Sequence, residues 1–139
     1  MQSKLTHIFL TTRGNTEILD ISPQVTDCIR SSSLTNGLVT IFSPSSTSGI
    51  TTIEYEPGVL EDLRKTFDEL VPKDQIYQHD EAWHDGNGHS HIRAALLKAS
   101  LTIPLVDGHL TLGTWQQIVF IDFDIRPRKR EIIVQILGE

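Results

Sequence analysis

Residues 101–137 read LTIPLVDGHLTLGTWQQIVFIDFDIRPRKREIIVQIL, and this stretch decides the fold class. Its apolar runs are short and rich in Val, Ile and Phe, which is typical of β-strands rather than of helices. Asp107-Gly108 and the residues around Pro127 supply turns between the runs. Strands are therefore expected over 101–106, 110–112, 115–124 and 131–137.

The rest of the chain adds four more strands and a few helices. Residues 4–12 and 16–21 are expected to form a hairpin around Arg13-Gly14-Asn15, and a Ser/Thr-rich loop joins two later strands. The later strands are expected over 38–43 and 50–55, and the helices over 22–32, from Pro57 to the residues before Pro72, and over 91–99. Consecutive hairpins predict an α+β fold with a mostly antiparallel sheet.

Composition limits the classes of function. The chain has 139 residues and a net charge of −6, which suits one domain over residues 1–139 and argues against binding to nucleic acid or an anionic membrane. Cys28 is the single cysteine, so a disulfide framework and a cysteine-based zinc cluster are both excluded. No apolar run is long enough for a membrane helix. We therefore expect a soluble, cytoplasmic protein.

The histidines are unevenly distributed, and this is the strongest chemical signal. Four of the six lie within thirteen residues, at positions 79, 84, 89 and 91, in a polar segment (74–90) that we expect to be a loop. Imidazoles and carboxylates bind divalent ions or act as acids and bases near neutral pH. His89 and His91 would project to one face only if the chain is extended there. The alternative is a polar surface loop whose histidines cap the next helix.

Four further features each have two interpretations. Glu54 lies either on an inward strand face, paired or metal-bound, or on the solvent face. The Ser/Thr-rich loop 43–48 either binds a phosphate or is an ordinary hairpin connection. The basic segment 126–130 either binds a phosphate or diphosphate or is a solvated turn. Trp115, after Gly113, is either a core residue or a pocket wall.

Several segments together resemble the YjbQ-like family, whose members are described as secondary thiamine-phosphate synthases. The most specific is Ser100–Gly108 followed by Gly113-Thr-Trp-Gln-Gln-Ile118, and the match spans essentially the whole chain. Weaker matches are Gly88-His-Ser-His91, Thr52-Ile-Glu54 and Pro127-Arg-Lys-Arg130. Many family members carry a histidine in the loop after the third strand, whereas Pro44-Ser45-Ser46-Thr47 has none here.

The resemblance implies a β-sandwich-like core with about three helices, assembled as a homotrimer with its active-site cavity between subunits. It also implies a weak, secondary activity that joins a pyrimidine diphosphate to a thiazole phosphate and releases pyrophosphate, with the primary role unknown. Such chemistry needs a divalent cation, Mg²⁺ or Zn²⁺, and cationic groups on the leaving diphosphate. The alternative is a non-catalytic trimeric module that binds a metal or a small ligand.

The residues expected to carry these roles fall into three sets. The catalytic set is Glu54, His79, Asn87 and His91. The substrate-binding set is Trp115, Gln116, Arg128 and Arg130, with Arg93 as a further arginine near the diphosphate. The metal ligands are expected to be His84, His89, His91 and Asp85.

Overall fold

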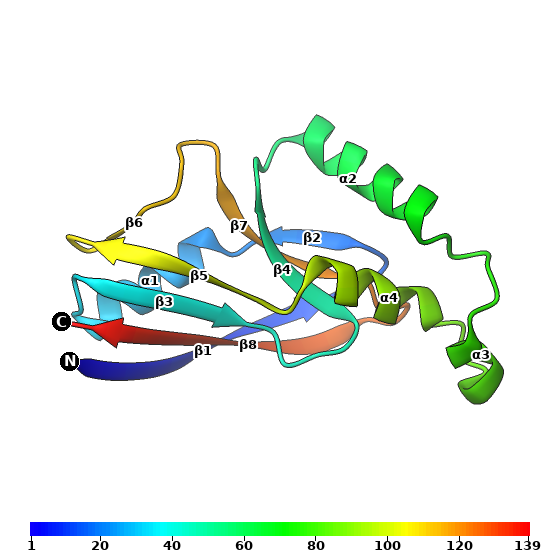
Figure 1. Cartoon of the computed structure of the whole chain (residues 1–139), viewed down its shortest axis with the longest axis horizontal. Helices are drawn as coiled ribbons and strands as arrows, with labels where there is room; N and C mark the ends of the chain where they lie inside the picture. The colour runs from blue at the N-terminus through cyan, green and yellow to red at the C-terminus, as the bar shows by residue number, and fades with distance from the viewer.

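A computed structural model describes residues 1–139 as eight strands and four helices (Figure 1). The strands are β1 (Gln2–Thr12), β2 (Glu17–Asp20), β3 (Gly37–Phe42), β4 (Ser48–Ile53), β5 (Ser100–Val106), β6 (His109–Leu110), β7 (Gln117–Asp122) and β8 (Arg128–Gly138). The helices are α1 (Ser22–Ser32), α2 (Pro57–Leu70), α3 (Gln78–Trp83) and α4 (Gly88–Leu97).

Two antiparallel sheets face each other across the main core. One has five strands in the order β1-β8-β3-β5-β6, and the other has three in the order β2-β7-β4. Fifteen buried residues, mostly Ile and Val, fill the space between the sheets, and α1 contributes Val25 and Ile29 to them. A second cluster packs α2 and α4 against the other face of the three-stranded sheet. The α+β class and the predominantly antiparallel pairing are thereby confirmed.

The expected hairpins are mostly wrong, because consecutive strands join different sheets. β1 pairs with β8 and β2 pairs with β7, so the expected N-terminal hairpin does not form. β3 and β4 also separate, and only β5 and β6 pair around Asp107-Gly108 as expected. The reason lies in β7, where Ile118 and Phe120 face one core cluster while Val119 and Ile121 face the other. A strand buried on both faces needs a central position with layers above and below it.

The expected polar loop 74–90 contains a helix and the start of another. α3 buries none of its residues, so burial does not explain it. The carboxylate of Asp80 accepts hydrogen bonds from the Tyr77 amide at 3.2 Å and from the Gly88 amide at 2.9 Å. Asp80 therefore caps α3 and ties it to the beginning of α4, three residues before the expected start. Apolar periodicity cannot detect a helix that is held by its caps.

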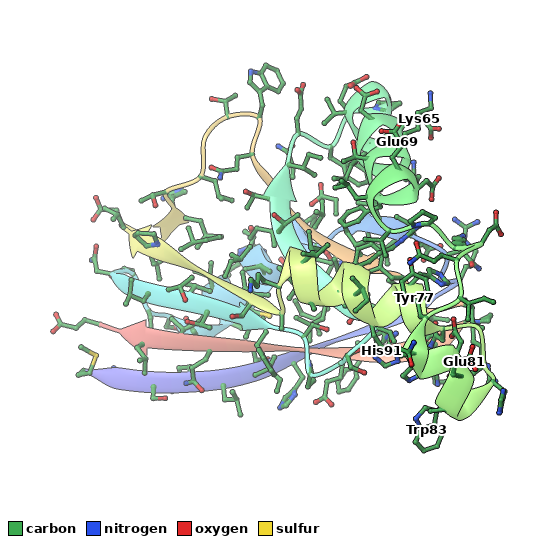
Figure 2. The ribbon with its side chains drawn as sticks, turned by 45° about the vertical axis from the view of Figure 1, so that its right-hand side comes forward. Lys65, Glu69, Tyr77, Glu81, Trp83 and His91 are labelled. Atoms are coloured by element: carbon green, nitrogen blue, oxygen red, sulfur yellow. The ribbon has the colours of Figure 1, made fainter.

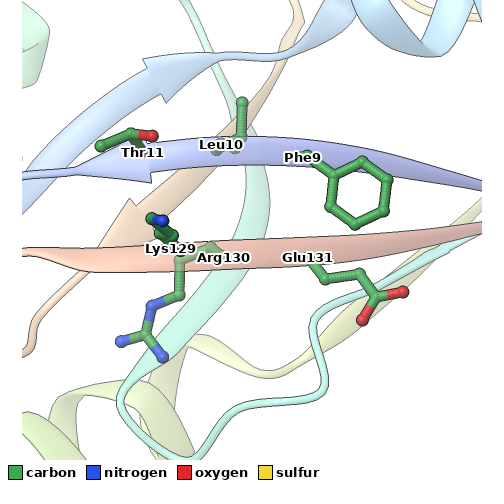
Figure 3. A pocket seen from close by; sticks show the side chains of 6 residues that line it. All are labelled: Phe9, Leu10, Thr11, Lys129, Arg130 and Glu131. Atoms are coloured by element: carbon green, nitrogen blue, oxygen red, sulfur yellow. The ribbon is translucent and has the colours of Figure 1, made fainter.

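The outer face of the five-stranded sheet has no covering element. Large apolar side chains alternate along it and are exposed to solvent, namely Leu5, Phe9, Leu38, Phe42 and Leu137. On this face the Phe9 ring of β1 lies beside Glu131 of β8, at a shallow depression of about 390 Å³ (Figure 3). None of the four helices has the length and apolar character that crossing a bilayer requires.

Candidate active site

Two buried aspartates at the end of β7 organise the site. Asp122 and Asp124 are two residues apart and almost completely buried. Arg130 of β8 donates to Asp122 through Nε at 2.7 Å and Nη2 at 2.9 Å, and the Thr12 hydroxyl donates at 2.6 Å. A bidentate pair of this kind is geometrically specific and compensates both buried charges. It fixes the start of β8 against the end of β7.

Asp124 connects three segments that are distant in sequence. Its Oδ2 atom accepts from Thr47 Oγ1 at 2.9 Å, Arg128 Nη2 at 3.1 Å and Asn87 Nδ2 at 3.3 Å. Burial by itself raises the pKa of Asp124, but these bonds and one from the Arg126 amide outweigh it and lower the pKa overall. Asp124 is therefore a carboxylate at neutral pH, and it holds the loop after β3, the α3–α4 connection and the β7–β8 turn together.

The two arginines of the β7–β8 region play different parts. Besides its pair with Asp122, Arg130 donates to Ser45 Oγ and Thr47 Oγ1, both at 2.8 Å, and its side chain is 12% exposed. Arg128 makes one side-chain bond, to Asp124, and its side chain is 43% exposed. Arg130 thus shapes the Ser/Thr loop, while Arg128 keeps donors available to an anion. Arg130 is largely buried and is not part of a solvated turn, whereas Arg128 is exposed but anchored to the buried Asp124.

A polar cleft of about 420 Å³ opens where these segments meet. Apart from Pro44, its walls carry hydroxyl, amide, imidazole, carboxylate and guanidinium groups. The lining residues are Pro44, Ser45, Ser46, Thr47, Asp85, Asn87, His91, Asp124, Arg128 and Arg130. The cleft has the composition of a site for a small anionic molecule rather than an apolar one.

A group of imidazoles and carboxylates borders the cleft on the side of α3. His79 Nδ1 lies 3.4 Å from Asp85 Oδ1, and the rings of His79 and His91 are 4.3 Å apart. Figure 2 shows His91 on α4 and Trp83 projecting from α3. Burial, and then the nearby His79, lower the pKa of His91, so its ring is neutral at pH 7. A neutral imidazole can accept a proton or bind a metal.

Other expected residues lie away from this group. His84 is exposed at the end of α3, and His89 is buried in the first turn of α4, where desolvation and the nearby Arg93 lower its pKa. Arg93 is fully buried and donates to the Val71 carbonyl and to Thr16, so it does not face the cleft.

Glu54, Trp115 and Gln116 lie near the far ends of β4 and β7. Glu54 is exposed just after β4, so of its two interpretations the solvent-facing one holds in a single chain. Gln116 bonds to Thr52 at 3.0 Å, whereas the cleft borders the Ser48 end of β4. Six strand residues separate the two ends by about 17 Å. One copy of the chain therefore does not bring all the expected residues into one cavity.

Sequence reasoning missed the aspartates on which the site is built. Both Asp122 and Asp124 belong to the strand expected over 115–124, and a period of two places both on one side of its end. Two acidic side chains that point to the same side at the end of an otherwise apolar strand are the signal from which this site could be predicted. Asp80, Ser45 and Thr47 gave no comparable signal, because each acts through a partner that is distant in sequence.

Comparison with known proteins gives one consistent match. Residues 6–139 match the family model described as UPF0047 protein YjbQ-like. A UPF0047 protein of Archaeoglobus fulgidus is 41% identical over 92% of this chain and 97% of its own length, and the Bacillus subtilis relative YugU is 34% identical over 88% and 90%. The crystal structure of a protein of unknown function from Sulfolobus solfataricus superposes with a TM-score of 0.93, at 33% identity over 99% of both chains.

Proposed function

This chain belongs to the YjbQ-like UPF0047 family, and from that premise we propose that it is an enzyme acting on a small phosphorylated substrate with the help of a divalent metal. The reaction proposed is a weak, secondary thiamine-phosphate synthesis, and the primary substrate is left open. One observation carries the proposal: a partly free arginine, a neutral histidine and a ring of hydroxyl and amide groups line the same polar cleft.

The reaction makes specific demands on the cleft. The bond between the pyrimidine methylene carbon and the diphosphate oxygen breaks, the thiazole nitrogen bonds to that carbon, and pyrophosphate leaves with the electron pair. Negative charge therefore grows on the leaving oxygens, where Arg128 can neutralise it through its remaining donors. Ser46 and Asn87 can hydrogen-bond the phosphate oxygens, and Arg130 keeps the Ser/Thr loop in place.

A divalent metal would share this task by neutralising the diphosphate. The chemistry of the bordering residues fits such an ion, since carboxylate oxygens and imidazole nitrogens are its usual ligands. Asp85 borders both the cleft and the histidine group, so an ion held there would be within reach of a bound phosphate.

We also propose a homotrimer whose cavity lies between subunits. Within one chain, Trp115 and Glu54 are at the wrong end of the three-stranded sheet to line the cleft. In a cyclic trimer each interface joins two different surfaces of the chain. The β6–β7 loop, at the top of Figure 1, could then complete the cleft of the neighbouring copy beside α3 and α4.

The test compares two neighbouring arginines. Purified protein with the pyrimidine diphosphate, the thiazole phosphate and a divalent metal should form thiamine phosphate and pyrophosphate in equal amounts. Arg128→Ala should lower kcat/KM by about a hundredfold, because it removes the charge that stabilises the leaving group. Arg126→Ala removes an exposed arginine that does not line the cleft, so its activity should stay within about twofold.

Three outcomes would count against the proposal. Absence of product from the wild-type protein would exclude the synthase, and equal activity of the two arginine variants would exclude this cleft. Stoichiometric pyrophosphate binding without any turnover would favour the alternative, a trimeric module that binds a metal or a small ligand.

A further inference from the structure

The connection between α3 and α4 places a histidine and two aspartates around a common point. The metal-binding atoms of His79, Asp80 and Asp85 all lie within 4.8 Å of one another. His79 and Asp80 are neighbours in α3, and Asp85 follows the left-handed turn at His84. This turn brings the chain back on itself, so three potential ligands come from only seven residues.

His79 Nδ1 is the atom that most needs an explanation. The atom itself is shielded from solvent and has no hydrogen-bond partner, although the His79 side chain as a whole is 31% exposed. Its separation of 3.4 Å from Asp85 Oδ1 is within ion-pair range, yet the two atoms are not aligned as donor and acceptor. A buried polar atom without a partner loses its interaction with water and gains nothing in return. A cation between the two atoms would satisfy both.

The distance between His79 Nδ1 and Asp85 Oδ1 is the one expected for two ligands of the same metal ion. Ligands about 2.0–2.1 Å from a tetrahedral zinc lie about 3.4 Å apart, because the angle between them is close to tetrahedral. Asp80 is fixed in place by the Tyr77 and Gly88 amides, and each of its oxygens retains a further lone pair. The two carboxylates offset the charge of a divalent ion.

We propose that His79, Asp80 and Asp85 form a site for a zinc-like divalent ion, with an open fourth position that faces the cleft. Three protein ligands leave the fourth position of a tetrahedral ion open. It faces the cleft because Asp85 belongs to the ligand set and also lines the cleft. Imidazole with two carboxylates suits Zn²⁺, whereas Mg²⁺ prefers oxygen ligands and octahedral geometry. The use of this ion in catalysis rests on the proposed function, but its binding does not. The ligand set differs from the one expected from sequence, since His84 and His89 are not in it.

The chain contains its own reporter of metal binding. The Trp83 ring stacks on the His79 ring, with centroids 6.4 Å apart, and Trp83 is 73% exposed. The other tryptophan is at the far end of the three-stranded sheet and can be replaced by Trp115→Phe. Metal-free Trp115→Phe protein is titrated with Zn²⁺ and, separately, with Mg²⁺, while Trp83 fluorescence and calorimetric stoichiometry are followed.

We expect one Zn²⁺ per chain, a change in Trp83 fluorescence, and weaker binding of Mg²⁺. His79→Ala should weaken Zn²⁺ binding by at least about tenfold, and His84→Ala, which removes an exposed histidine five residues away, should leave it unchanged. Asp85→Asn provides a second ligand variant if circular dichroism shows His79→Ala to be unfolded. No Zn²⁺ binding, or binding unaltered in both ligand variants, would overturn the site.

The site and the proposed reaction can fail separately. Zinc binding without thiamine-phosphate formation would uphold the site and contradict the synthase. Synthesis that continues in metal-free protein, together with absence of Zn²⁺ binding, would uphold the synthase activity and contradict both the site and the part proposed for a metal.

Discussion

At the scale of single residues, the pair of Asp122 with Arg130 is the contact on which the cleft depends. Asp122→Asn removes the bidentate charge partner of the largely buried Arg130 guanidinium and leaves it only Asp124 Oδ2 at 3.8 Å, so we expect a loss of about 3 kcal/mol in the free energy of unfolding. Urea unfolding measures this loss. Asp107→Asn, in an exposed turn with a left-handed backbone that Asn tolerates, should change stability by less than about 0.5 kcal/mol. Equal stability of the two variants would mean that the buried pair contributes little.

The histidines and the aspartates differ in how visible they are in the sequence. Histidines are uncommon, so four within thirteen residues draw attention to the cleft without any structure. Asp122 and Asp124 end a strand whose other residues are core, and their partners come from positions 12, 47, 87, 128 and 130. Which donors surround a buried carboxylate depends on tertiary packing, and local spacing does not encode it.

At the scale of elements, the junction between α3 and α4 depends on the absence of a side chain at Gly88. A Cβ atom there would lie 2.5 Å from Tyr77 Cβ, which is too close for any packing. Helix propensity alone predicts that Gly88→Ala stabilises the protein by about 1 kcal/mol. The clash predicts the opposite sign, a loss of about 1–3 kcal/mol, because Tyr77 and α3 must move away. Thermal unfolding decides between the signs.

Gly108→Asn is the matched control for Gly88→Ala. Gly108 lies in the turn between β5 and β6 with φ of +79°, and a Cβ atom there would meet nothing within 4 Å. Asn tolerates this backbone region, so its effect on stability should be small. A stabilised Gly88→Ala protein would show that α3 is not held against α4 as described.

Strand positions were predictable here, while strand partners were not. The apolar runs located β1, β3, β7 and β8 to within a few residues, since alternation and β-branched residues are local properties. Pairing is a property of the whole sheet. β7 is apolar on both faces and must be central, and this requirement sends neighbouring strands of the sequence into different sheets. A hairpin prediction from adjacency alone fails in such a sandwich.

At the scale of the whole molecule, the uncovered face of the five-stranded sheet bears on the proposed trimer. Phe9 is 77% exposed on the edge strand β1, and burying such a ring against another copy would contribute about 2 kcal/mol per interface. Phe9→Lys places an ammonium group opposite Glu131, so the separate chain keeps its fold while association becomes costly. We expect the wild-type protein to be trimeric and Phe9→Lys to be monomeric by light scattering after size exclusion. Leu70→Lys, at a 69% exposed position on α2, should remain trimeric. A trimeric Phe9→Lys protein would show that this sheet face lies outside the interface, and that the copies associate without it, as a contact of the β6–β7 loop with α3 and α4 of the next copy would allow.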